Sequence, residues 1–457
     1  MTYIKKFILT VCVLFVLAGA MRAAETTKPN VIFILSDDLG YGDLGCYGQQ
    51  RIKTPSIDKL AAEGTRFTQV YAGCTVCAPS RCSLMTGKHT GHATIRGNMA
   101  PEPSLRADET CVAEVFKAAG YHTALFGKWG VGMNDSTGAP NKKGFDQFFG
   151  YLTQGAAHNY YPPFIWRNTD KYPLDGNADG KQGTYTHDLF VQEALKYVRE
   201  HRDDPFFLYL ALTIPHTNNE AKPNGMQVPS DAPYSAETWP QAEKNFAAMI
   251  TRMDTDIGKL VALLKELNID ERTLVIFTSD NGPHKEGGHD AEFFQSRGDL
   301  RGIKRDLYEG GIRVPAIARW PGKVSAGKVS GQVWAFWDVL PTVAELTGQK
   351  IPDGIDGVSV LPGLLGTKAV EHPPLYWEFH ERGFSQAVRM GDWKAVKPGL
   401  QKPWELYDVS KDAGEAHDVS GENKEVVARV EEFVKTARVD SALFPIVPTK
   451  KGAAGDK

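Results

Sequence analysis

Short, uninterrupted apolar runs alternate with helix-like segments through much of this chain. The runs at 30–35, 205–213 and 273–278 are rich in β-branched and aromatic residues and contain no charged side chain. Apolar strands of this kind are buried on both faces, as in a parallel sheet covered by helices. Segments with helical spacing lie between them, at 55–64, 111–120 and 245–267. This order predicts an α/β fold with a doubly wound, mostly parallel sheet flanked by helices, in which ligands bind beyond the carboxyl ends of the strands.

The pattern changes after about residue 370. Short β-like segments lie within 374–410, and one amphipathic helix follows at 423–438. The chain has 457 residues, more than a single hydrophobic core usually accommodates. We therefore expect a smaller C-terminal domain made of an antiparallel sheet plus a helix. The expected organisation is a catalytic domain at 25–370, a C-terminal subdomain at 371–446 and a flexible tail at 447–457.

The first residues have the layout of a secretory signal peptide. Lys5 and Lys6 precede an apolar run at 7–20, and small residues follow it. The run is shorter than the ~20 residues that a membrane-spanning helix needs, although an uncleaved anchor is the alternative. We expect a signal peptide at 1–24, a periplasmic or secreted protein, and no membrane association after cleavage. The net charge of −3 does not support a nucleic-acid partner.

Cysteine usage fits an exported protein with one exceptional cysteine. Once Cys12 leaves with the signal peptide, an odd number remains: Cys46, Cys74, Cys77, Cys82 and Cys111. An odd number in an exported protein indicates that one cysteine has a different fate. If Cys77 is that one, the others can form two disulfides in any of three pairings. We expect Cys74 and Cys82 to form structural disulfides.

Two similar acidic turns follow apolar strands. The strand at 30–35 leads into Asp37 and Asp38, and the strand at 273–278 leads into Asp280 and Asn281. A single turn of this type is usually structural. Two of them on parallel strands open at one edge of a sheet, where their side chains can converge. A set of oxygen ligands suits Ca²⁺ or Mg²⁺ better than zinc.

The stretch "AGCTVCAPSRCSLMTG" at 72–87 holds the exceptional cysteine. Pro79 suits the first position of a helix, which predicts that Cys77 lies just ahead of a helix N-terminus. Backbone N–H groups and the helix dipole favour an anion there, and Arg81 adds a two-pronged donor. A redox pair has no thioredoxin-like context here, and a zinc site lacks a second pair of ligands. Cys77 therefore has the environment of a nucleophile that faces a phosphate or a sulfate.

The sequence "CAPSR" at 77–81, with "MTG" at 85–87, resembles the signature of the type I, formylglycine-dependent sulfatases. These enzymes form the arylsulfatase family of the alkaline phosphatase superfamily. The resemblance extends in chain order over further segments, at 31–48, 127–130, 214–216, 278–284, 302–315 and 405–412.

This resemblance implies a hydrolase that cleaves sulfate esters. In such enzymes a maturation enzyme, either formylglycine-generating or sulfatase-maturing, oxidises the cysteine that matches Cys77 to formylglycine. The hydrated aldehyde attacks the sulfur, the alcohol leaves, and sulfate is then ejected. Ca²⁺, rather than Mg²⁺, is held by this residue and by those matching Asp37, Asp38, Asp280 and Asn281.

The resemblance also assigns roles to the basic residues around the reacting group. Arg81 matches the residue that steadies the nucleophile, and Lys128 and Lys304 match lysines that hold the sulfate. His216 matches a candidate acid for the departing alcohol. The sequence departs from the pattern at Gly130, where many sulfatases have a histidine that helps to eject sulfate.

The substrate implied by the resemblance is a sulfated glycan. The segment 215–220, "PHTNNE", together with Gly130, is similar to a bacterial subgroup that acts on sulfated sugars. We expect a galactose or N-acetylgalactosamine type of glycan. Candidate substrate-binding residues are His158, His284 and His380, each with an ordinary structural role as the alternative. The aromatic segment at 159–166 fits stacking on sugar rings or packing in the core.

Two other functions remain open at this stage, and so does a purely structural domain, although the latter gives no reason for both acidic turns to lie at one sheet edge. A phosphodiester or phosphonate monoester hydrolase can use the same fold and the same aldehyde. A non-catalytic binder of sulfated glycans is consistent with Gly130, but it leaves the intact signature around Cys77 unexplained.

Overall fold

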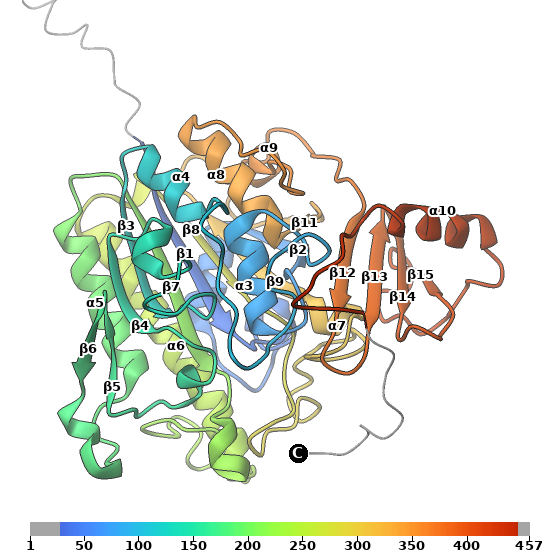
Figure 1. Ribbon diagram of the computed structural model, residues 1–457. Coiled ribbons are helices and arrows are strands. Elements are labelled where there is room, and N and C mark those ends of the chain that lie inside the picture. The colour runs from blue at the N-terminus through green and yellow to red at the C-terminus, as the bar shows by residue number, and fades with distance from the viewer. Residues whose placement is uncertain (1–27, 447–457) are drawn as a thin grey trace, which may run out of the picture.

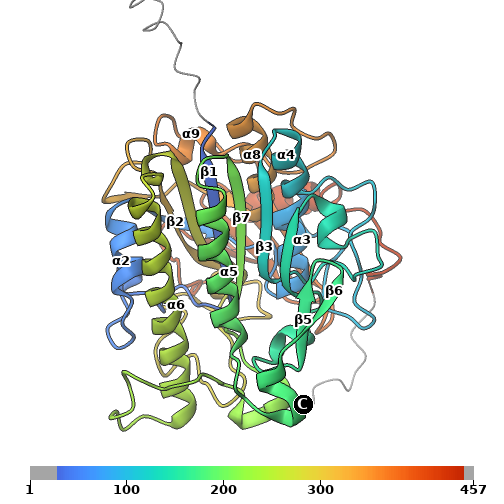
Figure 2. The same ribbon diagram turned by 90° about the vertical axis from the view of Figure 1, so that its left-hand side faces the viewer.

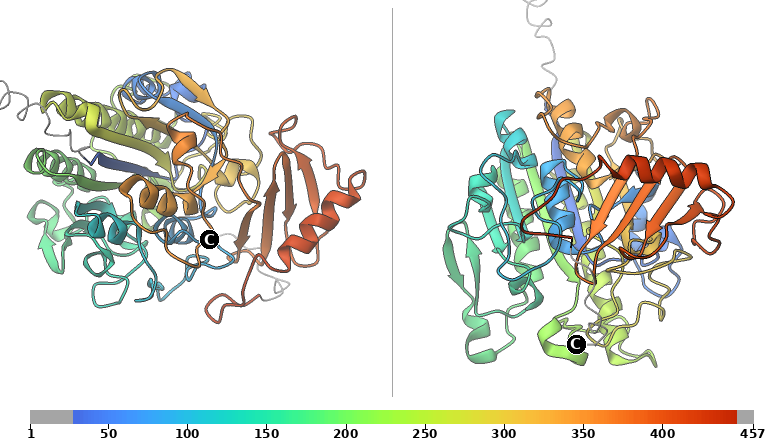
Figure 3. Two further views of the ribbon diagram at one scale, coloured as in Figure 1. Left: turned by 90° about the horizontal axis from the view of Figure 1, so that it is seen from above. Right: turned by 45° about the vertical axis from the view of Figure 1, so that its right-hand side comes forward.

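The computed structural model describes residues 28–446. A large sheet with helices on both faces forms the body of the molecule, and a smaller sheet with one helix packs beside it (Figure 1, Figure 3). The expected signal peptide at 1–24 and the expected tail at 447–457 lie outside the described residues. The sequence prediction of a doubly wound, mostly parallel α/β sheet with a smaller antiparallel sheet and helix is confirmed.

The large sheet has a parallel centre and antiparallel additions. Its order is β10-β2-β9-β8-β1-β7-β3-β4-β5-β6, with β11 paired to β2. Neighbours from β8 to β4 run parallel, whereas β9 is antiparallel to β8 and β2, and β5 and β6 are antiparallel to their neighbours. The strands are β1 (Asn30–Asp37), β2 (Thr65–Tyr71), β3 (His122–Lys128), β4 (Gln147–Tyr151), β5 (Phe164–Arg167), β6 (Asp170–Pro173), β7 (Phe206–Pro215), β8 (Thr273–Ser279), β9 (Arg313–Arg319), β10 (Lys328–Ser330) and β11 (Trp334–Ala335).

The three predicted apolar strands are β1, β7 and β8, and they are neighbours at the centre of the sheet. Val31 of β1 pairs with Phe207 on one side and with Leu274 on the other. Every residue of these strands is buried, because helices cover both faces of the sheet. The uninterrupted apolar pattern of the sequence therefore reports burial on both faces.

Alternate residues of β1 point into two different cores. Val31 and Phe33 pack in the core under α3, α4 and α8, whereas Ile32 and Ile34 pack in the core on the opposite face. Helices α2, α5 and α6 cover that opposite face (Figure 2). A side chain changes face with every residue along a strand, so one strand supplies both cores. The helices are α2 (Pro55–Ala62), α3 (Cys77–Thr86), α4 (Val112–Ala118), α5 (Thr186–Glu200), α6 (Gln241–Glu266), α7 (Glu309–Ile312), α8 (Val339–Thr347), α9 (Leu361–Leu364) and α10 (Lys424–Val434).

The second sheet packs against the segment that precedes Cys77. Its antiparallel strands, in order, are β12 (Leu375–Phe379), β13 (Ser385–Met390), β14 (Trp393–Lys397) and β15 (Glu405–Asp408), and α10 covers one face. Trp377 of β12 donates its indole N–H to the carbonyl of Ala72 at 2.9 Å. Trp377 also shares a hydrophobic core with Tyr71, Val76 and Trp337. The domain limit at residue 370 stays a prediction.

The prediction that Cys74 and Cys82 form disulfides is wrong, because all the cysteines among residues 28–446 are free. Cys74 lies in the core shared with the second sheet, where its sulfur is 3.8 Å from the carbonyl oxygen of Glu378. Cys82 points into the core under the main sheet. The two thiols therefore pack into different cores, and burial raises the pKa of each to about 12.

Among residues 28–446, no helix combines the length and apolar character that crossing a membrane requires.

A buried cluster of charges joins the second sheet to the main sheet. Lys394 of β14 lies 3.1 Å from the carboxylate of Glu309 and 3.2 Å from that of Glu415, and all three side chains are fully buried. Tyr71 donates a hydrogen bond to Glu309, and Arg313 pairs with the same carboxylate. Removing one partner of a buried ion pair leaves an uncompensated charge, which costs more than the pair itself contributes.

We expect Lys394→Met to lower the free energy of unfolding by about 3–5 kcal/mol, because it leaves two buried carboxylates without their shared cation. Lys411→Met is the matched control, since Lys411 is 82% exposed and its pair with Asp408 contributes less than about 1 kcal/mol. Urea denaturation measures both variants. Adding Glu415→Gln to Lys394→Met should recover part of the lost free energy of unfolding. If Lys394→Met and Lys411→Met lowered the free energy of unfolding by equal, small amounts, this account of the buried cluster would be contradicted.

Candidate active site

Four neighbouring parallel strands deliver polar side chains to one edge of the main sheet. Asp37 is the last residue of β1 and Lys128 is the last residue of β3. His216 directly follows β7, and Asp280 directly follows β8. All four side chains are buried. Because parallel strands end at the same edge of a sheet, residues that are far apart in the sequence meet there.

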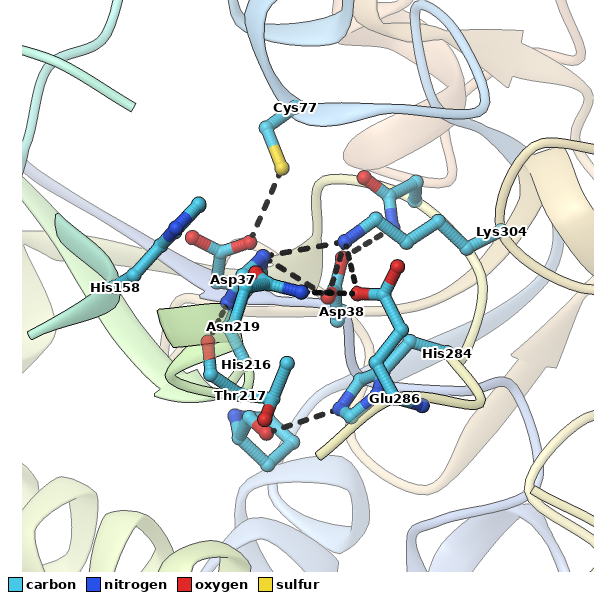
Figure 4. A network of polar contacts seen from close by, with 12 residues as sticks. Asp37, Asp38, Cys77, His158, His216, Thr217, Asn219, His284, Glu286 and Lys304 are labelled. Atoms are coloured by element: carbon cyan, nitrogen blue, oxygen red, sulfur yellow. Dashed lines mark hydrogen bonds and ion pairs between the residues drawn. The ribbon is translucent and has the colours of Figure 1, made fainter. Parts of the chain in front are cut away.

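Helix α3 brings Cys77 to this edge. Cys77 is the first residue of the helix, Val76 caps it in an extended conformation, and Pro79 is the third helical residue. The prediction that Pro79 opens the helix and that Cys77 precedes it is therefore wrong by two residues. Cys77 still lies at the N-terminus, and its sulfur is 3.4 Å from a carboxylate oxygen of Asp37 (Figure 4).

Arg81 and Lys128 neutralise two of the buried carboxylates. Arg81 contacts Asp280 at 2.9 Å and Asp37 at 3.3 Å, and Lys128 contacts Asp37 at 2.7 Å. Burial alone would raise the pKa of Asp37, but the charges of Lys128 and Arg81 hold it well below its usual value. Burial and the negative charge of Asp37 raise the pKa of Asp280. The two carboxylates thus compete for the same guanidinium.

Lys304 reaches the site from the loop that precedes α7. Its ammonium lies 2.7 Å from Asp38 and 3.2 Å from Nε2 of His216 (Figure 4). The Nδ1 atom of His216 lies 2.6 Å from the carbonyl of Thr217, so Nδ1 carries the proton and Nε2 accepts a hydrogen bond from Lys304. Burial, followed by the charge of Lys304, lowers the pKa of His216 well below its usual value. His216 is therefore neutral in this arrangement.

The acidic turns offer a set of ligands that fits a hard divalent cation. Asp37, Asp38 and Asp280 contribute carboxylates, and Asn281 contributes an amide. The side-chain oxygen of Asn281 is buried without a hydrogen-bond partner within residues 28–446, while its nitrogen donates to Asp38 at 2.7 Å. A buried, unpaired carbonyl oxygen is costly, and coordination of a cation would satisfy it. The residues present therefore fit Ca²⁺ or Mg²⁺.

Two of the predicted histidines lie beside this cluster. The ring of His158 stacks on the ring of His216, with centroids 4.9 Å apart and an interplanar angle of 13°. His284 is buried, and its Nε2 lies 3.3 Å from the carbonyl of Pro215. Figure 4 shows both histidines around Asp37 and Lys304.

The structure does not bring His380 into the same cluster. Its Nε2 atom contacts Glu378 at 3.0 Å, and its ring lies against Phe384 and Phe444. Glu378 is fully buried and also pairs with Arg96. His380 contributes to a packed polar network in the second sheet, and its proposed role with the substrate stays a prediction.

A side chain at position 130 would have to displace the side chain of Gln154. Gly130 has a φ of +75°, and a Cβ atom there would lie 2.0 Å from Nε2 of Gln154. Gln154 donates from this nitrogen to the carbonyl of Gly130 at 3.0 Å. The departure from the sulfatase pattern at Gly130 is therefore accompanied by a glutamine that occupies the adjacent space.

The sequence analysis missed a chain of charged contacts around the site. Glu286 contacts Lys304 at 3.5 Å and Arg305 at 2.5 Å, and Glu381 contacts Arg305 at 3.5 Å. Glu381 also accepts a hydrogen bond from the backbone N–H of Asn98 at 3.0 Å. Arg305 was detectable as the neighbour of Lys304, but Glu381 lies in the loop between β12 and β13 and belongs to no motif.

Comparisons with known proteins agree with this geometry. The sulfatase family model matches residues 29–349, and the model for the C-terminal part of N-sulphoglucosamine sulphohydrolase matches residues 303–440. N-acetylgalactosamine-6-sulfatase of Rattus norvegicus is 32% identical over 434 residues, covering 88% of this chain and 78% of the relative. Arylsulfatase A of Homo sapiens is 32% identical over 502 residues, covering 93% and 91%.

Solved structures have the same fold. The crystal structure of Ps i-CgsB in complex with k-i-k-neocarrahexaose is 30% identical, covers 93% of this chain and 96% of that chain, and has a TM-score of 0.79. The phosphonate monoester hydrolase of Agrobacterium radiobacter is 21% identical, covers 90% of this chain and 95% of that chain, and has a TM-score of 0.64. The likeness to the phosphonate monoester hydrolase shows the fold alone.

We expect Gly130→Ala to lower the free energy of unfolding by about 2 kcal/mol or more, since the methyl group meets Gln154 and the positive φ disfavours alanine. Gly155→Ala is the control, because a methyl group on Gly155 would have no neighbouring atom within 4 Å and the backbone there is helical. Chemical denaturation of the two variants measures the difference. Comparable stability of both variants would mean that Gln154 moves aside without cost.

Proposed function

Because the chain belongs to the sulfatase family, whose members hydrolyse sulfuric esters, we propose that it removes O-sulfate groups from a glycan of the galactose or N-acetylgalactosamine type. The observation that carries the catalytic part is Cys77 at a helix N-terminus, facing Asp37 among buried lysines. The sugar type is supported by the N-acetylgalactosamine-6-sulfatase relatives and by the neocarrahexaose in the Ps i-CgsB structure.

Cys77 is proposed to act as formylglycine rather than as a thiol. Members of this family generally use formylglycine and a divalent metal ion. Burial and the nearby charge of Asp37 raise the pKa of the Cys77 thiol well above its usual value. A thiol in this state supplies little thiolate at neutral pH, so it is a poor nucleophile. Formylglycine would instead supply a hydroxyl of its hydrated aldehyde as the nucleophile.

The proposed metal is Ca²⁺, held by Asp37, Asp38, Asp280 and Asn281 together with residue 77. When bound, the cation would stabilise negative charge on the nucleophile and on the sulfate group. Its support is the all-oxygen ligand set and the unpaired oxygen of Asn281. The family finding extends only to a divalent metal ion, so the choice of Ca²⁺ over Mg²⁺ belongs to the proposal.

The buried cations are proposed to bind the sulfate group. Burial opposes the charge of Lys304, but Asp38 raises its pKa, so the ammonium stays protonated. Burial likewise opposes the charge of Lys128, but the negative charge of Asp37 raises its pKa. Both ammonium groups are fixed by ion pairs before the substrate arrives, which reduces the reorganisation needed to hold sulfate oxygens. Arg81 holds two carboxylates and keeps the N-terminal turn of α3 at the site.

His216 is proposed to deliver a proton to the departing alcohol. Because Nδ1 faces the carbonyl of Thr217 and donates to it, Nε2 is unprotonated, and it faces the ammonium of Lys304 at 3.2 Å. Lys304 keeps its proton and orients the ring through this contact, so Nε2 must take up a proton from solvent before it acts as an acid. His158, stacked on His216, and His284, beside it, are proposed to contact the sugar.

Maturation and export complete the proposal. Formation of formylglycine requires a formylglycine-generating or sulfatase-maturing enzyme as a partner. The expected signal peptide would take the protein to the periplasm or outside the cell, where sulfated polysaccharides are available. The alternative substrates, phosphodiesters and phosphonate monoesters, are distinguished by assaying them in parallel with sulfate esters.

We expect Cys77→Ala to abolish sulfate release from sulfated galactose and N-acetylgalactosamine glycans while the unfolding temperature stays unchanged. Cys46→Ala is the control, since Cys46 is free and half-buried and its backbone N–H bonds Asp58, which is not a site residue. The protein is made in a host that installs formylglycine, and peptide mass spectrometry of residue 77 detects the aldehyde. An unmodified thiol at residue 77 in active protein, or normal turnover by Cys77→Ala, would overturn the mechanism. Faster hydrolysis of phosphonate esters than of sulfate esters would overturn the substrate class.

We expect Ca²⁺ to raise the unfolding temperature of chelator-treated protein with increasing concentration, because a ligand that binds only the folded state stabilises it. Asn281→Ala should weaken this response by removing one ligand. Asn224→Ala, an exposed asparagine, is the control. Differential scanning calorimetry with Ca²⁺ and with Mg²⁺ measures the effect without relying on turnover. A larger shift with Mg²⁺, or equal shifts in the two variants, would contradict the assignment.

A further inference from the structure

A cavity of about 370 Å³ lies next to the candidate active site, and none of the proposed catalytic residues lines it. Its size falls in the range of small-molecule sites in proteins. It is lined by Tyr151, Gly155, Ala156, Asn159, Pro162, Pro163, Phe164, Ile165, Trp166, Asn218 and Glu220.

The lining combines aromatic faces with a few polar groups. Phe164 and Trp166 are two residues apart on β5, so their side chains leave the strand on the same side, and both are half-buried. Their ring centroids are 6.2 Å apart at an interplanar angle of 76°. The ammonium of Lys171 lies over one face of the Phe164 ring, 4.5 Å from the ring centroid. Aromatic and proline surfaces suit the apolar face of a sugar ring.

The polar part of the lining suits hydroxyl groups. Glu220 offers a carboxylate and Asn159 an amide nitrogen, whereas the side-chain amide of Asn218 is already bonded to Gln227 and to the backbone of Glu220. Glu220 is the charged member of the lining, and its side chain is 67% exposed. A carboxylate accepts hydrogen bonds from sugar hydroxyls and repels a sulfate group. The lining therefore favours an uncharged sugar unit.

The cavity adjoins the reacting groups through His158. Glu220 contacts Nδ1 of His158 at 3.2 Å, and the His158 ring stacks on His216. Tyr151 lines the cavity and is the last residue of β4. It pairs with Lys128 of β3, so both residues lie at the same edge of the sheet. One histidine thus separates the cavity from the cluster around Cys77.

We infer that this cavity is a subsite for the unsulfated sugar next to the sulfated unit of a glycan chain. The inference rests on the proposed function and adds to it that the substrate is an oligosaccharide or a polysaccharide. It also divides the aromatic segment at 159–166 between two roles. Tyr160 is buried in the core and does not line the cavity, whereas Phe164 and Trp166 do.

The experiment compares one sulfated sugar in two forms. The probes are the monosulfated monosaccharide and an oligosaccharide that carries the same sulfated unit beside an unsulfated one. The measured quantity is the ratio of kcat/KM for the oligosaccharide to kcat/KM for the monosaccharide. Trp166→Ala and Phe164→Ala should each lower this ratio by about tenfold, the effect of losing one stacking contact. Two variants are used because either one alone can fail to fold.

Tyr172→Ala is the matched control. Tyr172 is an exposed aromatic residue of the same hairpin, on β6, and does not line the cavity. The ratio should not change in this variant. Isothermal calorimetry of the oligosaccharide with Cys77→Ala protein, with and without Trp166→Ala, gives a second readout that does not depend on turnover, and Trp166→Ala should weaken binding there.

The outcomes separate the two proposals. Wild-type turnover with an unchanged ratio in both cavity variants would overturn the subsite while leaving the sulfatase function intact. A preference for the oligosaccharide that both variants lose would support the subsite. Failure of the wild-type protein, with formylglycine present, to release sulfate from either probe would overturn the proposed glycan substrate and the subsite with it.

Discussion

The compensation of buried charge at one edge of the main sheet is the constraint on which the rest of the site depends. Three carboxylates lie out of contact with water, and each is paired with a buried cation. A buried charge without a partner would cost several kcal/mol, so each carboxylate fixes the position of the group that neutralises it. Arg81 ties α3 to the strand ends, and Lys304 ties the loop before α7 to β1. Charge pairing thus places Cys77 and the cations together.

The second sheet supports this arrangement from behind. Trp377 bonds the backbone of Ala72, five residues before Cys77, and packs with Val76, which caps the helix that Cys77 opens. Lys394 compensates Glu309, which begins α7 directly after the loop that carries Lys304. Both segments that bring chemistry to the sheet edge are therefore backed by the C-terminal part of the chain, which supplies rigidity through packing and buried ion pairs.

The surroundings of the site are graded from charged to apolar. At its base, carboxylates and ammonium groups lie side by side. This arrangement suits a site that binds an anionic group and a metal cation next to each other. His216 and His158, stacked on one another, form a wall, and beyond it lie aromatic side chains such as Trp166. Such a gradient suits a substrate with one charged group on an otherwise neutral body.

The sequence by itself determined the central strands and the acidic turns that follow two of them, because burial on both faces and the end of a strand are local patterns. It also determined that two acidic turns share an edge, since parallel strands leave no other arrangement. Only the tertiary structure decided that Cys74 and Cys82 stay free, because packing sends them into different cores. The same holds for Glu381, which approaches Arg305 from the second sheet, and for His380, which turns toward Glu378. Contacts between loops of separate elements depend on how those elements pack, and no local pattern encodes them.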